Sequence, residues 1–294
     1  MRVLVATDLS ESANEAIRQA HEWAGSANTF ATCHVVPNLQ PIVPLFPQST
    51  EHTIVDVAAF PARAEAAVRA RVGEVTGRGQ DDFEVFVDQG VDYAEIARRA
   101  TAWKADLVVV GSHGHTGLWR LLLGSVAERV ARVAPCPVLV ARPSPADGPV
   151  VAATDLSDPS LPAIAEGHAQ ATRRRVPLVA IHVVDLIPSL ASIAGVPFGI
   201  VPGTVSAAVL EEVRKVATTT LSEALERAHS EGESHVVIGD AAAGIVREAE
   251  SRHAQLVVVG THGRTGLAQM ALGSVAEKVL RAAPCSVLVV RFGG

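Results

Sequence analysis

Short apolar runs alternate with longer stretches of helical spacing along the whole chain. Helical spacing in the first half predicts helices over residues 11–24, 56–76, 92–103 and 125–134. Ser10 precedes the first of these and is a suitable N-cap. The apolar runs of the same half predict strands over residues 2–7, 29–36, 83–88, 107–110 and 137–141. The second half repeats the alternation, with strands near residues 150–154, 177–184, 235–239, 255–259 and 286–290.

The Val- and Leu-rich runs lack alternating polar residues, which is typical of strands buried on both faces of a parallel sheet. Strands that alternate with helices, joined by right-handed crossovers, predict a doubly wound α/β fold. We therefore expect two tandem α/β domains. Each has a five-stranded parallel sheet of order 3-2-1-4-5, flanked by helices.

The two halves are copies of each other. Residues 3–10 read VLVATDLS and residues 150–157 read VVAATDLS, while residues 111–140 and 260–289 are identical at 20 of 30 aligned positions. Between the copies, three prolines and one glycine within residues 143–149 indicate a linker. The predicted domains are residues 1–143 and 150–294, joined by residues 144–149.

Composition narrows the class of protein. With 48% hydrophobic and 19% charged residues, the chain is expected to fold rather than to be disordered. A net charge of −6 disfavours binding to nucleic acid. Three distant cysteines indicate a reducing compartment. Neither a signal peptide nor an apolar stretch of membrane-spanning length is evident, so we expect no membrane association and a cytoplasmic location.

A glycine-rich segment follows the fourth predicted strand of each copy. It reads Gly111-Ser112-His113-Gly114, nine residues, then Gly124-Ser125; the second copy reads Gly260-Thr261-His262-Gly263, nine residues, then Gly273-Ser274. A glycine loop between a strand end and a helix start lets backbone N–H groups and the helix dipole meet an anion. The spacing favours a phosphate cradle, and a plain turn inherited by both copies is the alternative.

Acidic residues are expected beside these loops. In a sheet of order 3-2-1-4-5, ligands bind at the carboxyl ends of strands 1 and 4, where the strand order reverses. Asp8 ends the first strand and Gly111 follows the fourth, and Asp155 and Gly260 repeat this arrangement. A carboxylate and a glycine loop thus meet twice, which predicts a phosphate-containing ligand in each copy.

The pattern G-xx-G-x9-G-[S/T], an early strand ending in Asp and a final Ala-Pro-Cys-x-Val-Leu-Val together resemble the universal stress protein family. The likeness covers essentially the whole chain as two fused copies of its ATP-binding branch. It implies two ATP sites, with Mg²⁺, in which Asp8 and Asp155 meet the adenine beside the backbone of Val35 and Val183. Ribose and phosphates would contact Gly111, Gly114, Gly124, Ser125 and Val126, and in the second copy Gly260, Gly263, Arg264, Gly273, Ser274 and Val275.

By this resemblance the protein is a nucleotide-dependent stress-response regulator, read by an unidentified protein partner. No catalytic residue or metal-ligand motif is evident, so any ATP hydrolysis is expected to be slow. Two alternatives stay open. One is a slow ATPase or nucleotidyl-transferring enzyme of the same fold. The other is a nucleotide-free module that binds another small molecule through the proline-rich segments 37–55 and 185–204.

The resemblance also implies a pseudo-dimer of domains within the chain, in which the fifth strands pair antiparallel, and leaves a homodimer of chains open. Several other residues have structural interpretations. His34 and His182 are expected to be hydrogen-bonded core histidines, and Cys136 and Cys285 small buried apolar residues. Arg173-Arg174-Arg175 is expected to end a helix and to favour its dipole.

One difference between the loops generates a prediction. His115 stands where the second copy has Arg264, at a position that the resemblance directs toward the phosphates. Arginine is always charged, whereas histidine has a reference pKa of about 6.5. At pH 8 the second site should bind ATP more tightly, and the first should tighten as the pH falls toward 6. Binding isotherms of wild type and His115→Arg test this, and an unchanged first-site affinity and pH dependence in the variant would exclude His115.

Overall fold

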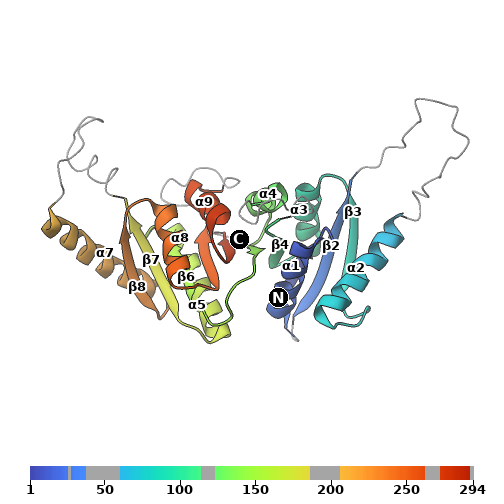
Figure 1. The fold of residues 1–294 in the computed structure, drawn as a ribbon, viewed down its shortest axis with the longest axis horizontal. Coiled ribbons are helices and arrows are strands. Elements are labelled where there is room, and N and C mark those ends of the chain that lie inside the picture. The colour runs from blue at the N-terminus through green and yellow to red at the C-terminus, as the bar shows by residue number, and fades with distance from the viewer. Residues whose placement is uncertain (26–27, 38–59, 114–122, 186–205, 262–271, 292–294) are drawn as a thin grey trace, which may run out of the picture.

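In the computed structural model, which describes residues 1–25, 28–37, 60–113, 123–185, 206–261 and 272–291, ten strands form one continuous sheet (Figure 1). The elements of the first half are β1 (Arg2–Ala6), α1 (Glu11–Ala24), β2 (Thr29–Val36), α2 (Phe60–Thr76), β3 (Glu84–Gln89), α3 (Asp92–Trp103), β4 (Leu107–Gly111), α4 (Ser125–Val133) and β5 (Val138–Ala141). Those of the second half are β6 (Val150–Thr154), the 3-10 turn η2 (Asp158–Ser160), α5 (Leu161–Arg174), β7 (Leu178–Val184), α7 (Ala207–Arg227), β8 (Glu233–Ile238), α8 (Ala241–Ser251), β9 (Leu256–Gly260), α9 (Ser274–Ala282) and β10 (Ser286–Val290).

The sheet confirms the predicted topology. Its strand order is β3-β2-β1-β4-β5-β10-β9-β6-β7-β8, so each half has the order 3-2-1-4-5 and all pairs within a half are parallel. The order reverses between β1 and β4, and again between β6 and β9. Residues 56–59 of the helix predicted over 56–76 lie outside the described residues, as do the proline-rich segments except for Pro37 and Asp185.

Helices cover both faces of the sheet, as buried Val and Leu runs require. One apolar cluster joins the strands to α3, α4, α8 and α9, and the other joins them to α1, α2, α5 and α7. The predicted cap of α1 is confirmed, because the Ser10 hydroxyl accepts a hydrogen bond from the Ala13 N–H at 3.3 Å. Within the described residues, no helix combines the length and the apolar character needed to cross a bilayer.

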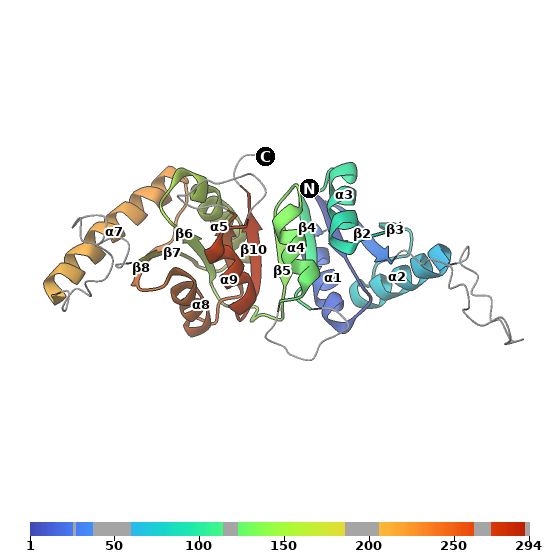
Figure 2. The ribbon, with the colours of Figure 1, turned by 90° about the horizontal axis from the view of Figure 1, so that it is seen from above.

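The two halves meet edge to edge. β5 and β10 pair antiparallel, with Leu139 opposite Leu288, and Figure 2 shows these strands side by side at the centre of the molecule. This is the pairing that the resemblance implied. It places every residue of both strands in the core, so neither edge is left open for association with another chain.

Two arginines reinforce this seam reciprocally. Arg142 follows β5 and donates hydrogen bonds to the carbonyl of Leu280, in the last turn of α9, and to that of Cys285, which directly precedes β10. Arg291 follows β10 and donates to the carbonyls of Ala131 and Arg132, at 3.1 and 2.8 Å, at the end of α4. Each domain therefore supplies a cation to the negative end of the other domain's helix.

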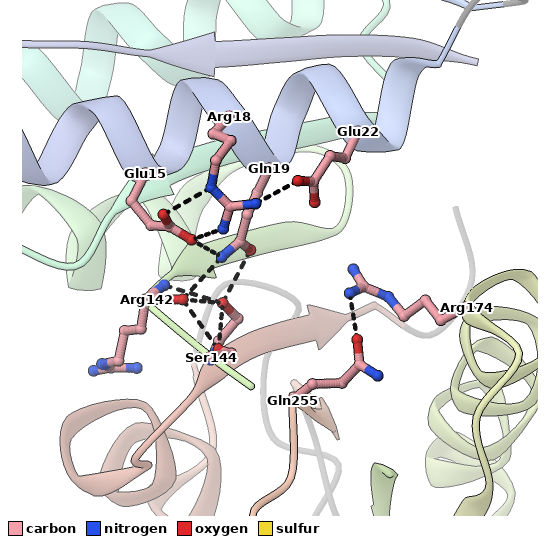
Figure 3. Close-up of polar contacts among 9 residues, drawn as sticks. Glu15, Arg18, Gln19, Glu22, Arg142, Ser144, Arg174 and Gln255 are labelled. Atoms are coloured by element: carbon pink, nitrogen blue, oxygen red, sulfur yellow. Dashed lines mark hydrogen bonds and ion pairs between the residues drawn. The ribbon is translucent and has the colours of Figure 1, made fainter. Parts of the chain in front are cut away.

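Ion pairs and a buried polar cluster complete the seam. Arg281 pairs with Glu128 at 3.0 Å, and Arg132 pairs with Glu277 at 3.3 Å, so α4 and α9 exchange charges in both directions. Beneath α1, the Gln19 side chain donates to the Arg142 carbonyl and accepts from the Ser286 hydroxyl (Figure 3). The bonds of the Ser286 hydroxyl to Gln19 Oε1 and to the Arg142 carbonyl cross the domain boundary, so separation of the domains would break both of them.

The triple arginine ends α5, as predicted, and Arg173 and Arg174 lie in its last turn, where a cation favours the helix dipole. The Arg173 guanidinium also donates to the carbonyls of Glu22 and Trp23 at the end of α1, in the other domain. The sequence did not show this second role, because nothing in it indicated that the ends of α1 and α5 adjoin. Arg175 takes the left-handed conformation that closes α5.

The seam predicts the behaviour of the separate halves. Residues 1–143 or 150–294 expressed alone would expose a fully apolar strand edge together with the unpaired groups of Gln19, Arg142 and Ser286. Each half should therefore form dimers or aggregate. Size-exclusion chromatography with light scattering measures the mass of each half in solution. Two soluble, monomeric halves would contradict the importance of the seam.

Candidate functional site

Each half has a cleft at the carboxyl ends of its central strands, where the strand order reverses. The first cleft has a volume of about 220 Å³ and the second about 280 Å³. The first is lined by predicted residues Asp8, Val35, Gly111, Gly124, Ser125 and Val126. The second is lined by their counterparts Asp155, Val183, Gly260, Gly273, Ser274 and Val275. All predicted residues that the structure describes thus gather in two places. Gly114, Gly263, Arg264 and His115 lie outside the described residues.

The acidic residue of each cleft is fixed by a turn. Asp8 Oδ1 accepts hydrogen bonds from the backbone N–H and the hydroxyl of Ser10, at 3.0 and 2.5 Å. Asp155 Oδ1 accepts the same pair from Ser157, at 3.1 and 2.5 Å. The carboxylates therefore hold the strand-to-helix turn while they line the cleft.

Backbone strain marks the same turn in both copies. Leu9 and Leu156, which directly follow the two aspartates, both have φ of 67°. Leucine rarely adopts this left-handed region, which costs about 1–3 kcal/mol and persists only where the surroundings impose it. The hydrogen bonds of Asp8 and Asp155 are part of what imposes it. No sequence pattern signalled this feature, because leucine gives no hint of positive φ.

The glycines before α4 and α9 pack tightly against the loops that follow β4 and β9. Gly124 N–H donates to the Ser112 carbonyl at 2.7 Å, and Gly273 N–H donates to the Thr261 carbonyl at 2.8 Å. A Cβ at either glycine would lie 3.3 or 3.1 Å from the same carbonyl oxygen. A Cβ at Gly111 would lie 3.1 Å from the Ser12 carbonyl oxygen. Close backbone packing, rather than positive φ, therefore favours glycine at these three positions.

The helix starts carry donors to the cleft. Gly124 and Gly273 are the N-cap residues of α4 and α9, and neither helix has a side-chain cap. Ser125 and Ser274 are exposed, and Val275 is 38% exposed although it is apolar. The first-turn N–H groups of an uncapped helix suit an anionic group, and the helix dipole adds to this preference.

Sequence reasoning missed part of the apolar wall. Ile96 from α3 and Ile245 from α8 occupy equivalent places in the two clefts, and Val110 and Val259 from the central strands add to them. Neither isoleucine was named in the sequence analysis. The place of these isoleucines in the clefts could have been inferred once the third helix of each half was known to pack beside the second strand, which carries Val35 or Val183.

The clefts also differ in chemistry. Asp92, at the start of α3, lines the first cleft where Ala241 lines the second, and Cys33 stands where the second cleft has Ile181. Burial raises the pKa of Cys33 to about 12, with a further contribution from Asp88. Asp88 is 7% exposed and is held by Arg98 and Arg99. The first cleft is therefore the more polar of the two, with a neutral thiol at its base.

The remaining candidates have structural roles. His34 Nδ1 lies 2.8 Å from the Thr7 carbonyl and His182 Nδ1 2.9 Å from the Thr154 carbonyl, which confirms the hydrogen-bonded interpretation of both histidines. Cys136 and Cys285 are buried as predicted, and burial raises the pKa of each thiol to about 12. Across the described ranges, no group of three or more His, Cys, Asp or Glu side chains is placed to hold a metal ion.

Comparison with known proteins gives a consistent assignment. The sequence profile of the universal stress protein family matches residues 1–142 and residues 148–291. A universal stress protein of Mycobacterium bovis is 38% identical over 194 residues, which cover 64% of this chain and 62% of that protein. A second protein of that name and organism is 33% identical over 249 residues, or 82% of this chain and 73% of the relative. The first match thus spans less than two thirds of the relative's length.

Solved structures agree on the fold. A universal stress protein from Archaeoglobus fulgidus superimposes with a TM-score of 0.64 at 20% identity, covering 99% of this chain and 98% of its own. A functionally unknown protein from Pseudomonas aeruginosa superimposes with a TM-score of 0.63 at 19% identity, covering 99% and 92%. Both likenesses extend over the two halves, so the tandem arrangement is shared.

The turn at Asp8 predicts a difference between two substitutions. Asp8→Ala removes the acceptor of both Ser10 hydrogen bonds and should lower the free energy of unfolding by about 1–3 kcal/mol. Asp8→Asn keeps an Oδ1 acceptor in the same place and should lower it much less. Urea unfolding measures both variants, and equal losses would show that the turn does not depend on this acceptor.

Proposed function

The chain belongs to the universal stress protein family, and from that premise we propose that it binds ATP in both clefts and acts as a nucleotide-dependent regulator. The observation that carries the proposal is the duplicated cleft itself. A fixed carboxylate, an apolar wall and an uncapped helix start converge at the strand-order reversal of each half.

The chemistry of the clefts suits an adenine nucleotide. The aliphatic side chains of Val35 and Ile96, or of Val183 and Ile245, offer an apolar slot for a flat base. A carboxylate accepts from the adenine amino group and repels the guanine carbonyl. Because a carboxylate can accept about four hydrogen bonds, the bonds from Ser10 or Ser157 are compatible with one from a ligand.

The phosphates would lie toward the helix starts. Backbone donors at Gly124-Ser125 and Gly273-Ser274, with the serine hydroxyls, match the acceptors of a phosphate chain. Clefts of 220 and 280 Å³ fall just below the ~300–1,000 Å³ of typical ligand sites. Mg²⁺ binds chiefly to phosphate oxygens and water, so it would accompany ATP without a cage of protein ligands.

A regulatory output accords with these groups better than rapid turnover does. The described polar lining offers fixed acceptors and backbone donors, which bind and orient a ligand. In this proposal the ATP-bound state is recognised by a protein partner in the cytoplasm. Any hydrolysis of ATP is slow, and one chain holds two nucleotides.

Isothermal titration calorimetry with Mg-ATP tests the proposal and should give a stoichiometry near two. Because Asp92 adds negative charge to the first cleft alone, we expect two unequal affinities. Asp92→Ala should tighten only one of them, which assigns that isotherm to the first cleft. Absence of ATP binding would overturn the proposal, and a stoichiometry of one would restrict it to a single domain.

The preference of the clefts for adenine over guanine can be tested by the same calorimetric titration, with GTP beside ATP. The double variant Asp8→Asn, Asp155→Asn keeps the turn acceptors but replaces each carboxylate by an amide that can also donate to the guanine carbonyl. The preference for ATP over GTP should fall by about tenfold, as expected for exchange of one hydrogen bond to a charged group. An unchanged preference would remove both aspartates from base recognition.

A further inference from the structure

A small notch lies at the domain seam, between α1 of the first half and α5 of the second. It has a volume of about 170 Å³ and is lined by Glu22, Trp23, Gln170, Arg173 and Arg174. None of these residues lines either cleft. Figure 3 shows Arg174 reaching from its helix toward the side of α1 where Gln19 and Glu22 lie. Both domains therefore contribute to the notch.

The guanidinium of Arg174 is incompletely paired. Its Nη1 donates to Gln255 Oε1 at 2.9 Å, and this is the one hydrogen bond of Arg174 within the described parts of the chain. Its Nε is shielded from solvent and has no hydrogen-bond partner. Nε and Nη2 together form the side-on edge of the guanidinium, so the edge that remains is the one suited to two parallel hydrogen bonds.

Other arginines of this chain show what that edge holds. Arg18, Arg69 and Arg99 each use Nε and Nη2 to bind one carboxylate. Their acceptors are Glu15, Glu65 and Asp88, respectively. At Arg174 the edge formed by Nε and Nη2 binds no carboxylate, although the Arg174 side chain is more deeply buried than that of Arg18.

A second donor in the notch also lacks a partner. Trp23 is 3% exposed, and its indole Nε1–H is buried without a hydrogen-bond acceptor. The guanidinium groups of Arg173 and Arg174 lie 5.8 and 5.6 Å from the centre of the Trp23 ring. Two kinds of orphan donor, Nε–H of arginine and Nε1–H of tryptophan, thus belong to residues of a single notch, and each needs an acceptor.

The charges around the notch favour an anion. Burial lowers the pKa of Arg174, the carboxylate of Glu22 opposes this, and the cations Arg173 and Arg18 lower the pKa further. Glu22 is already engaged in an ion pair with Arg18. The Arg173 guanidinium donates to main-chain carbonyls, so it brings positive charge without a neutralising carboxylate. A negative charge beside Arg174 would compensate for its burial.

We propose that the notch is a binding site for a small oxyanion, a free phosphate or carboxylate. Small rotations of the Arg174 and Trp23 side chains open their shielded donors to the notch, so that Nε and Nη2 of Arg174 hold the anion side-on and the indole N–H of Trp23 is a further donor. Such an anion contacts α1 and α5 at once, so it joins the two domains. Binding to the folded chain alone then raises the stability of the whole protein in proportion to the anion concentration.

The test uses the fluorescence of Trp23 in the full chain. Trp103→Phe and Trp119→Phe leave Trp23 as the one remaining tryptophan of the sequence. Sodium phosphate and sodium succinate are titrated separately, with sodium chloride keeping the ionic strength constant. A saturable change in Trp23 emission is expected, and the more effective titrant shows whether phosphate or carboxylate is preferred. No saturable change with either anion would overturn the proposal.

Three variants locate the response. Arg174→Gln should weaken the anion by about tenfold or more, because two hydrogen bonds to a charged group are lost. Glu22→Gln removes the one carboxylate of the notch and should tighten binding by about twofold to fivefold. Arg175→Gln removes the neighbouring exposed charge and should leave the affinity unchanged.

These variants also separate the notch from the clefts. Phosphate bound at α4 or α9 would not depend on Arg174, so a response that survives Arg174→Gln unchanged would refute the notch site. If Arg174→Gln does not fold, as judged by circular dichroism, the anion affinity of Glu22→Gln decides instead. That variant is expected to bind the anion more tightly than wild type. A Glu22→Gln affinity equal to or weaker than that of wild type would then refute it. ATP stoichiometry should be the same in all three variants, whichever way the anion test falls.

Discussion

The antiparallel pairing of β5 with β10 is the contact on which the rest of the molecule depends. It converts two five-stranded sheets into one sheet of ten strands and buries the edge that each domain would otherwise expose. This strand pair fixes the direction and the register of one domain's sheet relative to the other, but it brings few side chains into contact across the boundary. The arrangement is completed by Arg142 and Arg291, which each reach across to the carbonyl end of the opposite helix.

This reciprocity ties the seam to the clefts. α4 and α9 each begin at a cleft and end at an arginine from the other domain. The ion pairs Glu128–Arg281 and Arg132–Glu277 join the first turn of each helix to the last turn of the other. The same two helices therefore form part of a ligand site and part of the domain interface. On the opposite face of the sheet, α1 and α5 meet through Arg173 and enclose the notch around Arg174.

The two clefts have the same backbone geometry but differ in the chemistry of their side chains. Both copies keep the aspartate turn with leucine at φ of 67°, and both keep glycine where a Cβ would press against a carbonyl oxygen. These features belong to the backbone. Asp92 stands against Ala241 and Cys33 against Ile181, so the cleft walls differ while the backbone around them is the same.

The sequence by itself determined the duplication, the strand order within each domain, and the carboxylate and glycine loop that meet at each cleft. Those inferences rest on local periodicity and on the rule that parallel strands end at a common edge. The sequence also anticipated the cap at Ser10 and the hydrogen-bonded histidines. The affinity of the clefts for a nucleotide is a separate matter and stays a prediction.

Tertiary structure alone decided the features that depend on segments distant in the chain. Arg173 lies in the last turn of α5 as expected, but it also donates to the end of α1, because the pairing of β5 with β10 joins the two domains. The same applies to the orphan edge of Arg174, to the apolar wall around Ile96 and Ile245, and to the role of Asp8 in its turn. Periodicity specifies which face of an element is buried. It does not specify which side chain of another domain lies against it, since that is fixed by packing across the seam.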